Sequence, residues 1–229
     1  MFINPFGIIV SIVLFKICQH FKRIPVIGRL PPIFIAGMIL IVILEYFQID
    51  IRLYNESASY LTLPLIPATI ALGYPIYQHL DLLRKNKRVI YSAFAVATVV
   101  AIISTYIAAA LCNTSLNVIE SILPKSVTAP IAIEISKGNG GIPELTACVV
   151  VLTGVFGAVF GHHILKLVRV KSSIAIGLSM GAASHVLGTA RCIEKGNEKQ
   201  VVMSSVALVI VGILTTVVVP LFLYLIETR

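Results

Sequence analysis

The sequence predicts an all-α protein embedded in a membrane, because apolar residues dominate its composition and fall in long uncharged runs. Of its 229 residues, 58% are hydrophobic and 12% are charged, whereas about 25% of the residues in a typical soluble domain are charged. Residues 89–112 and 201–226 contain no charge at all, and roughly 20 apolar residues are enough for a helix to cross a bilayer core. We therefore expect a polytopic membrane protein with one transmembrane domain over residues 1–229.

Eight hydrophobic elements follow one another along the chain. They cover residues 5–19, 31–47, 61–77, 89–112, 117–136, 142–168, 172–191 and 201–226. The chain starts directly with an apolar run, without a cationic leader or a small-residue cleavage site. We therefore expect a retained first helix and not a signal peptide.

Basic residues in the connections predict how these elements cross the membrane. Lysine and arginine follow the first element at positions 22, 23 and 29, and the third at positions 84, 85, 87 and 88. The positive-inside rule places such loops in the cytoplasm. If every later element crossed, Lys166, Arg169 and Lys171 would face the outside. This conflict disappears if the fifth and seventh elements enter the membrane and return on the same side.

Three segments differ from ordinary spans because they combine helix-breaking or small residues with polar side chains. They are LPLIPATIALGYP at 63–75, LPKSVTAPIAIE at 123–134 and GAASHVLGTAR at 181–191. Proline interrupts a helix, and interrupted backbone at membrane depth is tolerated only where protein or a water-filled cavity satisfies its polar groups. A broken helix also exposes a half-helix N-terminus, which attracts anions. In the first segment, Pro67 and Thr69 are candidate substrate-binding residues.

The second segment favours a carboxylate site. Pro130 suits the first turn of a half-helix, where its missing N–H costs nothing, and Lys125, Ser126 and Thr128 precede it. A positive charge, hydroxyls and unpaired N–H groups are suitable partners for a carboxylate. The alternative interpretation is a simple proline kink.

The third segment places a titratable group at membrane depth. Ser184 and Arg191 share one helical face, while His185 and Thr189 share a neighbouring face by their i, i+4 spacing. An ionisable group inside a membrane segment suggests a functional site, and histidine titrates near physiological pH, so His185 could relay a proton or donate to an anion. The alternatives are helix packing with one satisfied histidine and, for Arg191, a cytoplasmic anchor.

A faint internal repeat joins the third and fourth elements to the seventh and eighth. In each pair, an interrupted or polar segment and a charged connection precede a clean apolar span. Repeats of this kind are common in secondary transporters. Shared membrane composition is the alternative explanation.

Other function classes find less support. The net charge of +8 would suit nucleic-acid binding in a soluble protein, but the basic residues lie in short loops, so we expect no nucleic-acid partner. The four cysteines lack CxxC spacing, and His162 and His163 are adjacent and point in different directions, so we expect no metal or cofactor. No nucleophile–base–acid set is present, and we expect no enzyme. Gly154, Gly157 and Gly161 form a small-residue face that predicts helix packing.

The same segments resemble the LrgB family of bacterial membrane proteins (CidB/LrgB), including its YohK-like members. The matching stretches are PATIALGYPIY at 67–77, SILPKSVTAPIA at 121–132, GGIP at 140–143 and ASHVLGTAR at 183–191. The resemblance runs from about Pro31 to the C-terminus, and the combination of PKSVT with SHxxGTAR is specific. The sequence departs from the family at Ala129 and Ala182, where threonine is frequent, and each change removes a hydroxyl near the expected site.

The resemblance implies a multi-pass protein of the bacterial inner membrane with one of two functions. One is an antiholin-like modulator of murein hydrolase export and cell lysis, acting with a small LrgA-type membrane partner. The other, suggested by plastid relatives that move glycolate and glycerate and by bacterial relatives linked to pyruvate, is a carrier of small monocarboxylates. The clustered prolines, lysine and histidine favour the carrier, with a small carboxylate and the lipid bilayer as partners and His185 as a route for coupled protons. Assembly into a homo-oligomer is a further expectation that the sequence leaves open.

Overall fold

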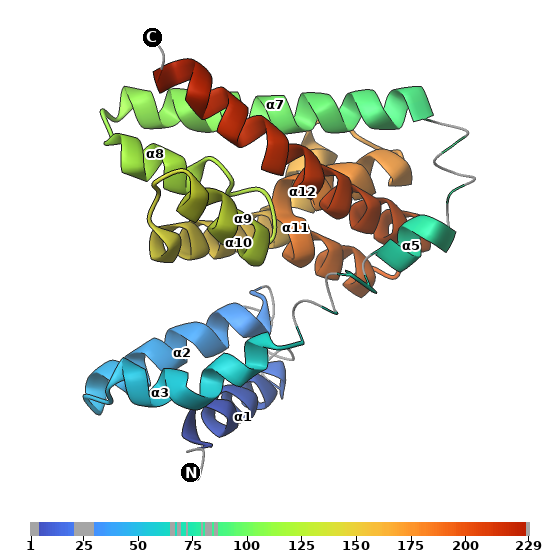
Figure 1. Cartoon of the computed structure of the whole chain (residues 1–229). Coiled ribbons are helices and arrows are strands. Elements are labelled where there is room, and N and C mark those ends of the chain that lie inside the picture. Colours follow the sequence, from blue (N-terminus) through green and yellow to red (C-terminus); the bar gives the residue numbers. More distant parts are fainter. Residues whose placement is uncertain are drawn as a thin grey trace. The chain divides into compact units, whose positions relative to one another are not determined.

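The computed structural model describes residues 5–20, 30–64, 67, 70–71, 73–78, 80, 84 and 87–227. Every regular element in these residues is helical, which confirms the expected all-α class. The elements, shown in Figure 1, are α1 (Phe6–His20), α2 (Pro32–Tyr46), α3 (Ile51–Ala58), the short 3₁₀ helix η3 (Ser59–Thr62), α5 (Gly73–Gln78), α7 (Lys87–Leu111), α8 (Leu116–Ile122), α9 (Ala129–Gly138), α10 (Pro143–Leu167), α11 (Ser173–Glu194) and α12 (Glu198–Glu227).

Contacts between residues divide the chain into two compact units, Met1–Ala71 and Leu72–Arg229. The single transmembrane domain expected from the sequence stays a prediction. The first unit contains the two shorter apolar helices, and the second contains all the long ones.

In the first unit, α1 and α2 each have 15 residues. Each is about 22 Å long, which is shorter than the roughly 30 Å hydrocarbon core of a bilayer. α1 packs closely on α3, since the Gly7 N–H donates to Ser57 Oγ over 2.9 Å. The stretch forming α3 is too polar to count among the eight hydrophobic elements. It is helical because it is capped: the Asp50 side chain accepts from the Arg52 N–H.

The second unit contains the four helices that, among the described residues, are long and apolar enough to cross a membrane. Their apolar stretches are Ile90–Leu111, Pro143–Leu167, Ser173–Glu194 and Glu198–Ile226. A single core cluster joins all four helices and the stretch before α9. With the shorter apolar helices, these stretches make the chain a polytopic membrane protein.

α11 is a helical hairpin and not a straight span, although its 22 residues are long enough to cross. Its backbone leaves the helical conformation at His185, where φ is 42° and ψ is −132°. Three residues later, Gly188 lies against the carbonyl oxygen of Met180. Beyond the helix, the Asn197 side chain donates to Ser173 Oγ at its start over 3.3 Å. A straight helix would hold these ends about 32 Å apart, so the chain enters and leaves at the same end.

A similar hairpin is formed by α8, residues 123–128 and α9. After α9 the chain is back beside the end of α8, where the Ile142 N–H donates to Ser121 Oγ over 2.7 Å. We call residues 116–138 the first hairpin and α11 the second hairpin. They correspond to the fifth and seventh hydrophobic elements, so the predicted interruption of both elements is confirmed.

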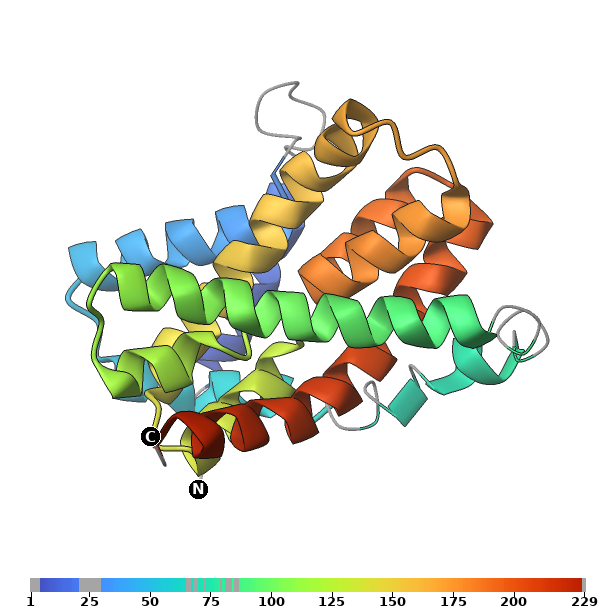
Figure 2. The ribbon, with the colours of Figure 1, turned by 90° about the horizontal axis from the view of Figure 1, so that it is seen from above.

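The two hairpins start from opposite ends of α10. The base of the first hairpin adjoins the start of α10, where Thr146 Oγ1 donates to Ser136 Oγ over 2.7 Å. The base of the second adjoins the other end, where His162 Nε2 lies 3.1 Å from the Gln200 amide oxygen at the start of α12. Figure 2 shows the gold α10 beside the orange α11.

These elements form a repeat with a period of 56 residues. α7 and α10 have 25 residues each, and a hairpin follows each of them. Residues with positive φ end the elements at the same spacing: Asn113 and Arg169 follow the helices, and Gly140 and Gly196 follow the hairpins. Each repeat contains one long helix and one hairpin that returns, so the second repeat runs in the opposite direction to the first. The repeated pair is therefore different from the pair that the sequence suggested.

Candidate functional site

The tips of both hairpins approach the central parts of α10 and α12. We call residues 123–128 the first tip and residues 184–186 the second tip. The second tip contacts α10 between Val150 and Gly157, close to the middle of a helix that is about 37 Å long.

On α12, the two hairpins contact positions about two turns apart. Gly181, just before the second tip, lies against the backbone of Ser204, and Ile131, just after the first tip, lies against Gly212. These two positions on α12 are about 12 Å apart along the helix axis. The two tips therefore flank one short stretch of α12, in the core of the second unit.

Thr128 is the most informative residue of the first tip. It stands at the N-cap of α9, where a threonine oxygen usually accepts a hydrogen bond from a helix N–H, yet its side chain makes no capping bond. Its Oγ1 is buried and has no hydrogen-bond partner in the described part of the chain. Burying an unpaired hydroxyl costs free energy, so Oγ1 and the uncapped start of α9 are suited to an external acceptor. Pro130 occupies the first turn of α9, as predicted.

Lys125 and Ser126 complete the first tip. Ser126 is buried and Lys125 is half-buried. Among the described residues, the Lys125 ammonium has no ion-pair or hydrogen-bond partner. Partial removal of an ammonium from water costs free energy, because it disfavours the charged form. An anion beside the ammonium would offset that cost.

His185 forms the turn of the second hairpin. Its side chain is 5% exposed, and its Nε2 lies 3.0 Å from the Val150 carbonyl oxygen of α10. Gly154 makes room for the imidazole, since a Cβ there would lie 2.5 Å from Cε1. A positive φ is unusual for a residue other than glycine and costs about 1–3 kcal/mol, and such strain occurs most often at functional sites.

Ser184 and Thr189 flank this histidine. Both are buried, and Ser184 Oγ lies directly against Gly157 of α10. Thr189 Oγ1 donates to the His185 carbonyl oxygen over 3.3 Å. The predicted packing role of the glycine face of α10 is confirmed, because Gly154, Gly157 and Gly161 all contact the second hairpin.

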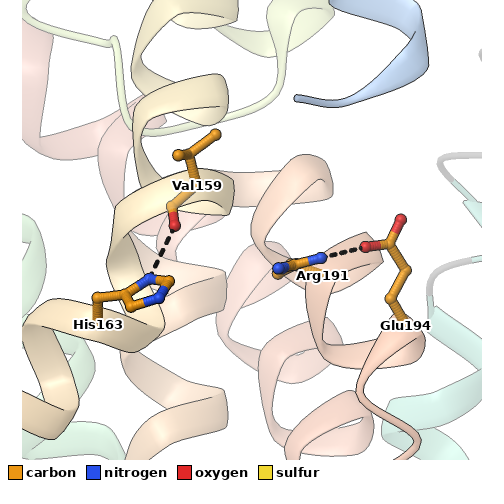
Figure 3. A network of polar contacts seen from close by, with 4 residues as sticks. All are labelled: Val159, His163, Arg191 and Glu194. Atoms are coloured by element: carbon orange, nitrogen blue, oxygen red, sulfur yellow. Dashed lines mark hydrogen bonds and ion pairs between the residues drawn. The ribbon is translucent and has the colours of Figure 1, made fainter. Parts of the chain in front are cut away.

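Arg191 is placed away from the tip. It lies six residues beyond His185, about 9 Å along the returning half-helix, and pairs with Glu194 over 2.7 Å. Figure 3 shows this pair and, on α10, His163 bonded to the Val159 carbonyl. Both interactions stay within their own helices. The geometry is that of an anchored arginine near the base of the hairpin.

The remaining candidates of the first interrupted segment belong to the other unit. Pro67 is exposed, and Thr69 lies outside the described residues. No group of three or more histidine, cysteine or acidic residues that could hold a metal ion occurs in the described ranges.

Sequence reasoning missed two contributors to the second unit. Val150 acts through its backbone carbonyl, and no side-chain pattern can reveal such a role. Gln200 is 8% exposed and bonds His162 across the base of the second hairpin. A glutamine just before a long apolar run was a usable signal, because an amide needs a hydrogen-bond partner wherever the fold buries it.

Comparisons with known proteins agree with this architecture. The model of the LrgB-like family matches residues 11–225. Relatives named "Antiholin-like protein LrgB" from Bacillus mycoides (strain KBAB4) and Bacillus cereus (strain B4264) are each 36% identical over 219 residues, which cover 95% of this chain and 95% of theirs. No solved structure matches the chain.

The fold and the two interrupted hairpins define an all-helical, polytopic membrane protein. Within that class, the chain belongs to the LrgB-like family. The family resemblance carried by the PKSVT and SHxxGTAR stretches is thereby confirmed.

Proposed function

We propose that this chain is a multi-pass carrier of the bacterial inner membrane that moves small monocarboxylates, such as glycolate, glycerate and pyruvate, together with protons. The main support is that two hairpins from opposite ends of α10 bring the starts of two half-helices to the centre of one helical unit. Interrupted helices whose N-termini meet within an inverted repeat are a recurrent design of anion-binding secondary transporters.

The chemistry of the first tip favours a single small carboxylate. The unpaired Thr128 hydroxyl, the first-turn N–H groups of α9 and the Lys125 ammonium are all donors within or directly after the first tip. Charge-assisted bonds to a carboxylate are about twice as strong as neutral ones. The apolar surroundings, which include Val127 and Val150, favour a ligand with one charged end and little further polar surface.

A carrier accounts for these residues better than an enzyme does. Catalysis by a serine or threonine needs a base within hydrogen-bond reach of the hydroxyl. The imidazole of His185 instead engages a backbone carbonyl. The hydroxyl of Thr128 lacks a partner in the described part of the chain.

Uptake into proteoliposomes tests this function. Purified protein is reconstituted and offered labelled pyruvate, glycolate, lactate and acetate, beside protein-free vesicles. We expect saturable uptake that falls more than about tenfold when Lys125→Gln and Thr128→Val are combined, because two donors of about 1–3 kcal/mol each are lost. Elution volume and melting temperature establish that the variant is folded. Absence of saturable uptake of all four acids in the parent contradicts the proposal.

The names of the relatives favour a second candidate. Proteins called antiholin-like are 36% identical to this chain, so control of murein hydrolase export and lysis, with a small LrgA-type membrane partner, is the alternative function. Lysis is measured in a strain without its own copy, complemented by the parent or by the double variant. If the transport-deficient variant restores control of lysis fully, the antiholin-like role is independent of transport.

A further inference from the structure

We propose that Nδ1 of His185 is the atom that binds and releases the proton carried with each carboxylate. This inference rests on the proposed carrier function and assigns its coupling site. It follows from the bonding of the imidazole, from the backbone that holds it and from the groups that surround it.

The bond to Val150 fixes which ring nitrogen titrates. Nε2 lies 3.0 Å from the Val150 carbonyl oxygen, and a carbonyl oxygen only accepts, so Nε2 carries a hydrogen. Neutral imidazole has a hydrogen on one nitrogen only. Nδ1 is therefore the acceptor in the neutral ring and the second donor in the charged ring, while Nε2 keeps its bond throughout.

The surrounding backbone holds the ring in this orientation. A Cβ on Gly154 would lie 2.7 Å from Nε2, so the glycine leaves space for this ring position. His185 also keeps a φ of 42°, a conformation that glycine adopts at much lower cost. A histidine at a turn where glycine would be less strained indicates that the imidazole itself is needed.

His185 is the titratable residue of the second tip, residues 184–186. α10 presents Val150 and Gly154 to the ring, and α7 contributes apolar residues such as Phe94 to the core. α12 has no titratable residue from 201 to 223. His162 lies about 18 Å further along α10 than Val150. Lys125 is the charged group of the first tip, and it supplies the carboxylate with a fixed positive charge. Glu120, Glu134 and Lys137 lie on the two helices of the same hairpin, and the Glu120 carboxylate lies beside Gly140 at the base.

The resulting transport step is balanced in charge and in protons. A carboxylate binds at Lys125 and Thr128 while Nδ1 takes one proton from water on the same side. Both leave on the other side, which returns the imidazole to its neutral form. One anion and one proton cross together, so uptake responds to a pH gradient and not to the membrane potential.

Two substitutions remove the titratable ring, and each keeps a polar group near the position of one ring nitrogen. His185→Gln places an amide near the Nε2 position and retains a donor for Val150. His185→Asn places an amide near the Nδ1 position, and asparagine tolerates positive φ. Neither side chain titrates. His162→Gln is the matched control, because it replaces the histidine at the base of the same hairpin and away from the tips.

The measurement is pyruvate uptake and the accompanying proton uptake, recorded with a trapped pH dye in proteoliposomes. For one coupled proton, affinity changes by up to about tenfold per pH unit. For the parent and His162→Gln, we expect the affinity for pyruvate to depend on pH in this way and the trapped dye to report acidification inside the vesicles. Both His185 variants are expected to exchange labelled for unlabelled pyruvate without either response.

Each other outcome overturns a specific claim. A full pH response in both His185 variants removes Nδ1 as the coupling site. Potential-driven uptake without proton movement in the parent removes proton coupling but leaves the carrier function standing. Parent protein that neither accumulates nor exchanges any of the four acids removes the carrier function itself.

Discussion

The two hairpins occupy equivalent places in the repeat, yet their tips are built differently. The second hairpin turns within a single residue, His185, and glycines fix it against both neighbours: Gly157 on α10 receives Ser184, and Gly177 within the hairpin lies against Gln200 of α12. The first hairpin turns through the six residues 123–128, which separate α8 from α9.

This difference assigns different tasks to the two tips. Close backbone contacts hold the imidazole in one position, which suits a group that must present a single nitrogen. The longer first tip contains Lys125 and ends at the start of α9, where Thr128 makes no capping bond. In the proposed carrier, the two repeats are similar in fold, while the side chains of the first tip bind the anion and His185 of the second tip binds the proton.

The largest effect on stability is expected from a larger residue at Gly157, where α10 contacts the second hairpin. A Cβ at Gly157 would collide with the Ser184 side chain, and overpacking costs typically 1–3 kcal/mol. Gly157→Val should therefore lower the melting temperature of the purified protein markedly. Gly138→Ala in the first hairpin is the control, because its Cβ would meet nothing within 4 Å. Equal melting temperatures in the two variants would show that the second hairpin is not held by this contact.

Removing the charge of the first tip should reduce affinity strongly. Hydrogen bonds to charged groups contribute about 1.5–3 kcal/mol, so Lys125→Gln should weaken carboxylate binding roughly ten- to a hundredfold. Lys137→Gln at the exposed end of α9 is the matched control and should bind as the parent does. The apparent affinity for uptake is measured for both variants. Unchanged kinetics in Lys125→Gln would give Lys125 a structural role.

Thr128→Val should separate binding from stability. Valine keeps the shape but removes an unpaired buried hydroxyl, so stability should stay equal or rise. Carboxylate affinity should fall about fivefold, the loss of one hydrogen bond of roughly 1 kcal/mol. Thr146→Val is the opposite case, because it breaks the bond to Ser136 and should lower stability with little change in affinity. A destabilised Thr128→Val protein with normal affinity contradicts this assignment.

The smallest expected effect compares the two turns that end the hairpins. Gly140 and Gly196 have φ values of 87° and 66°, so alanine is strained at both. A Cβ at Gly140 would also lie 3.0 Å from the Glu120 carboxylate, whereas at Gly196 it would meet nothing. Gly140→Ala should therefore be the less stable variant, by less than about 1 kcal/mol. Thermal unfolding of both variants measures this difference in stability. A lower melting temperature for Gly196→Ala than for Gly140→Ala would contradict the prediction.

Much of the candidate site could be predicted from the sequence because its signals are local. Proline at position 130 and the run of polar residues from Lys125 to Thr128 indicate an interrupted helix, which the structure contains. The second interruption has no proline. It was indicated by the basic residues that would otherwise lie outside, among them Lys166 and Arg169. Hydropathy alone would count Ser173–Glu194 as a continuous membrane span and would miss the turn at His185.

The sequence by itself determined that the chain is an apolar, all-helical membrane protein of the LrgB-like family, and where its polar residues interrupt the membrane segments. These properties depend on composition and on residues adjacent in the chain. Only the tertiary structure decided that α11 turns at His185 and that Val150 accepts from its imidazole. These choices depend on contacts between residues up to 35 positions apart, where glycines on neighbouring helices permit close approach. Such contacts leave no periodic signal in a single sequence.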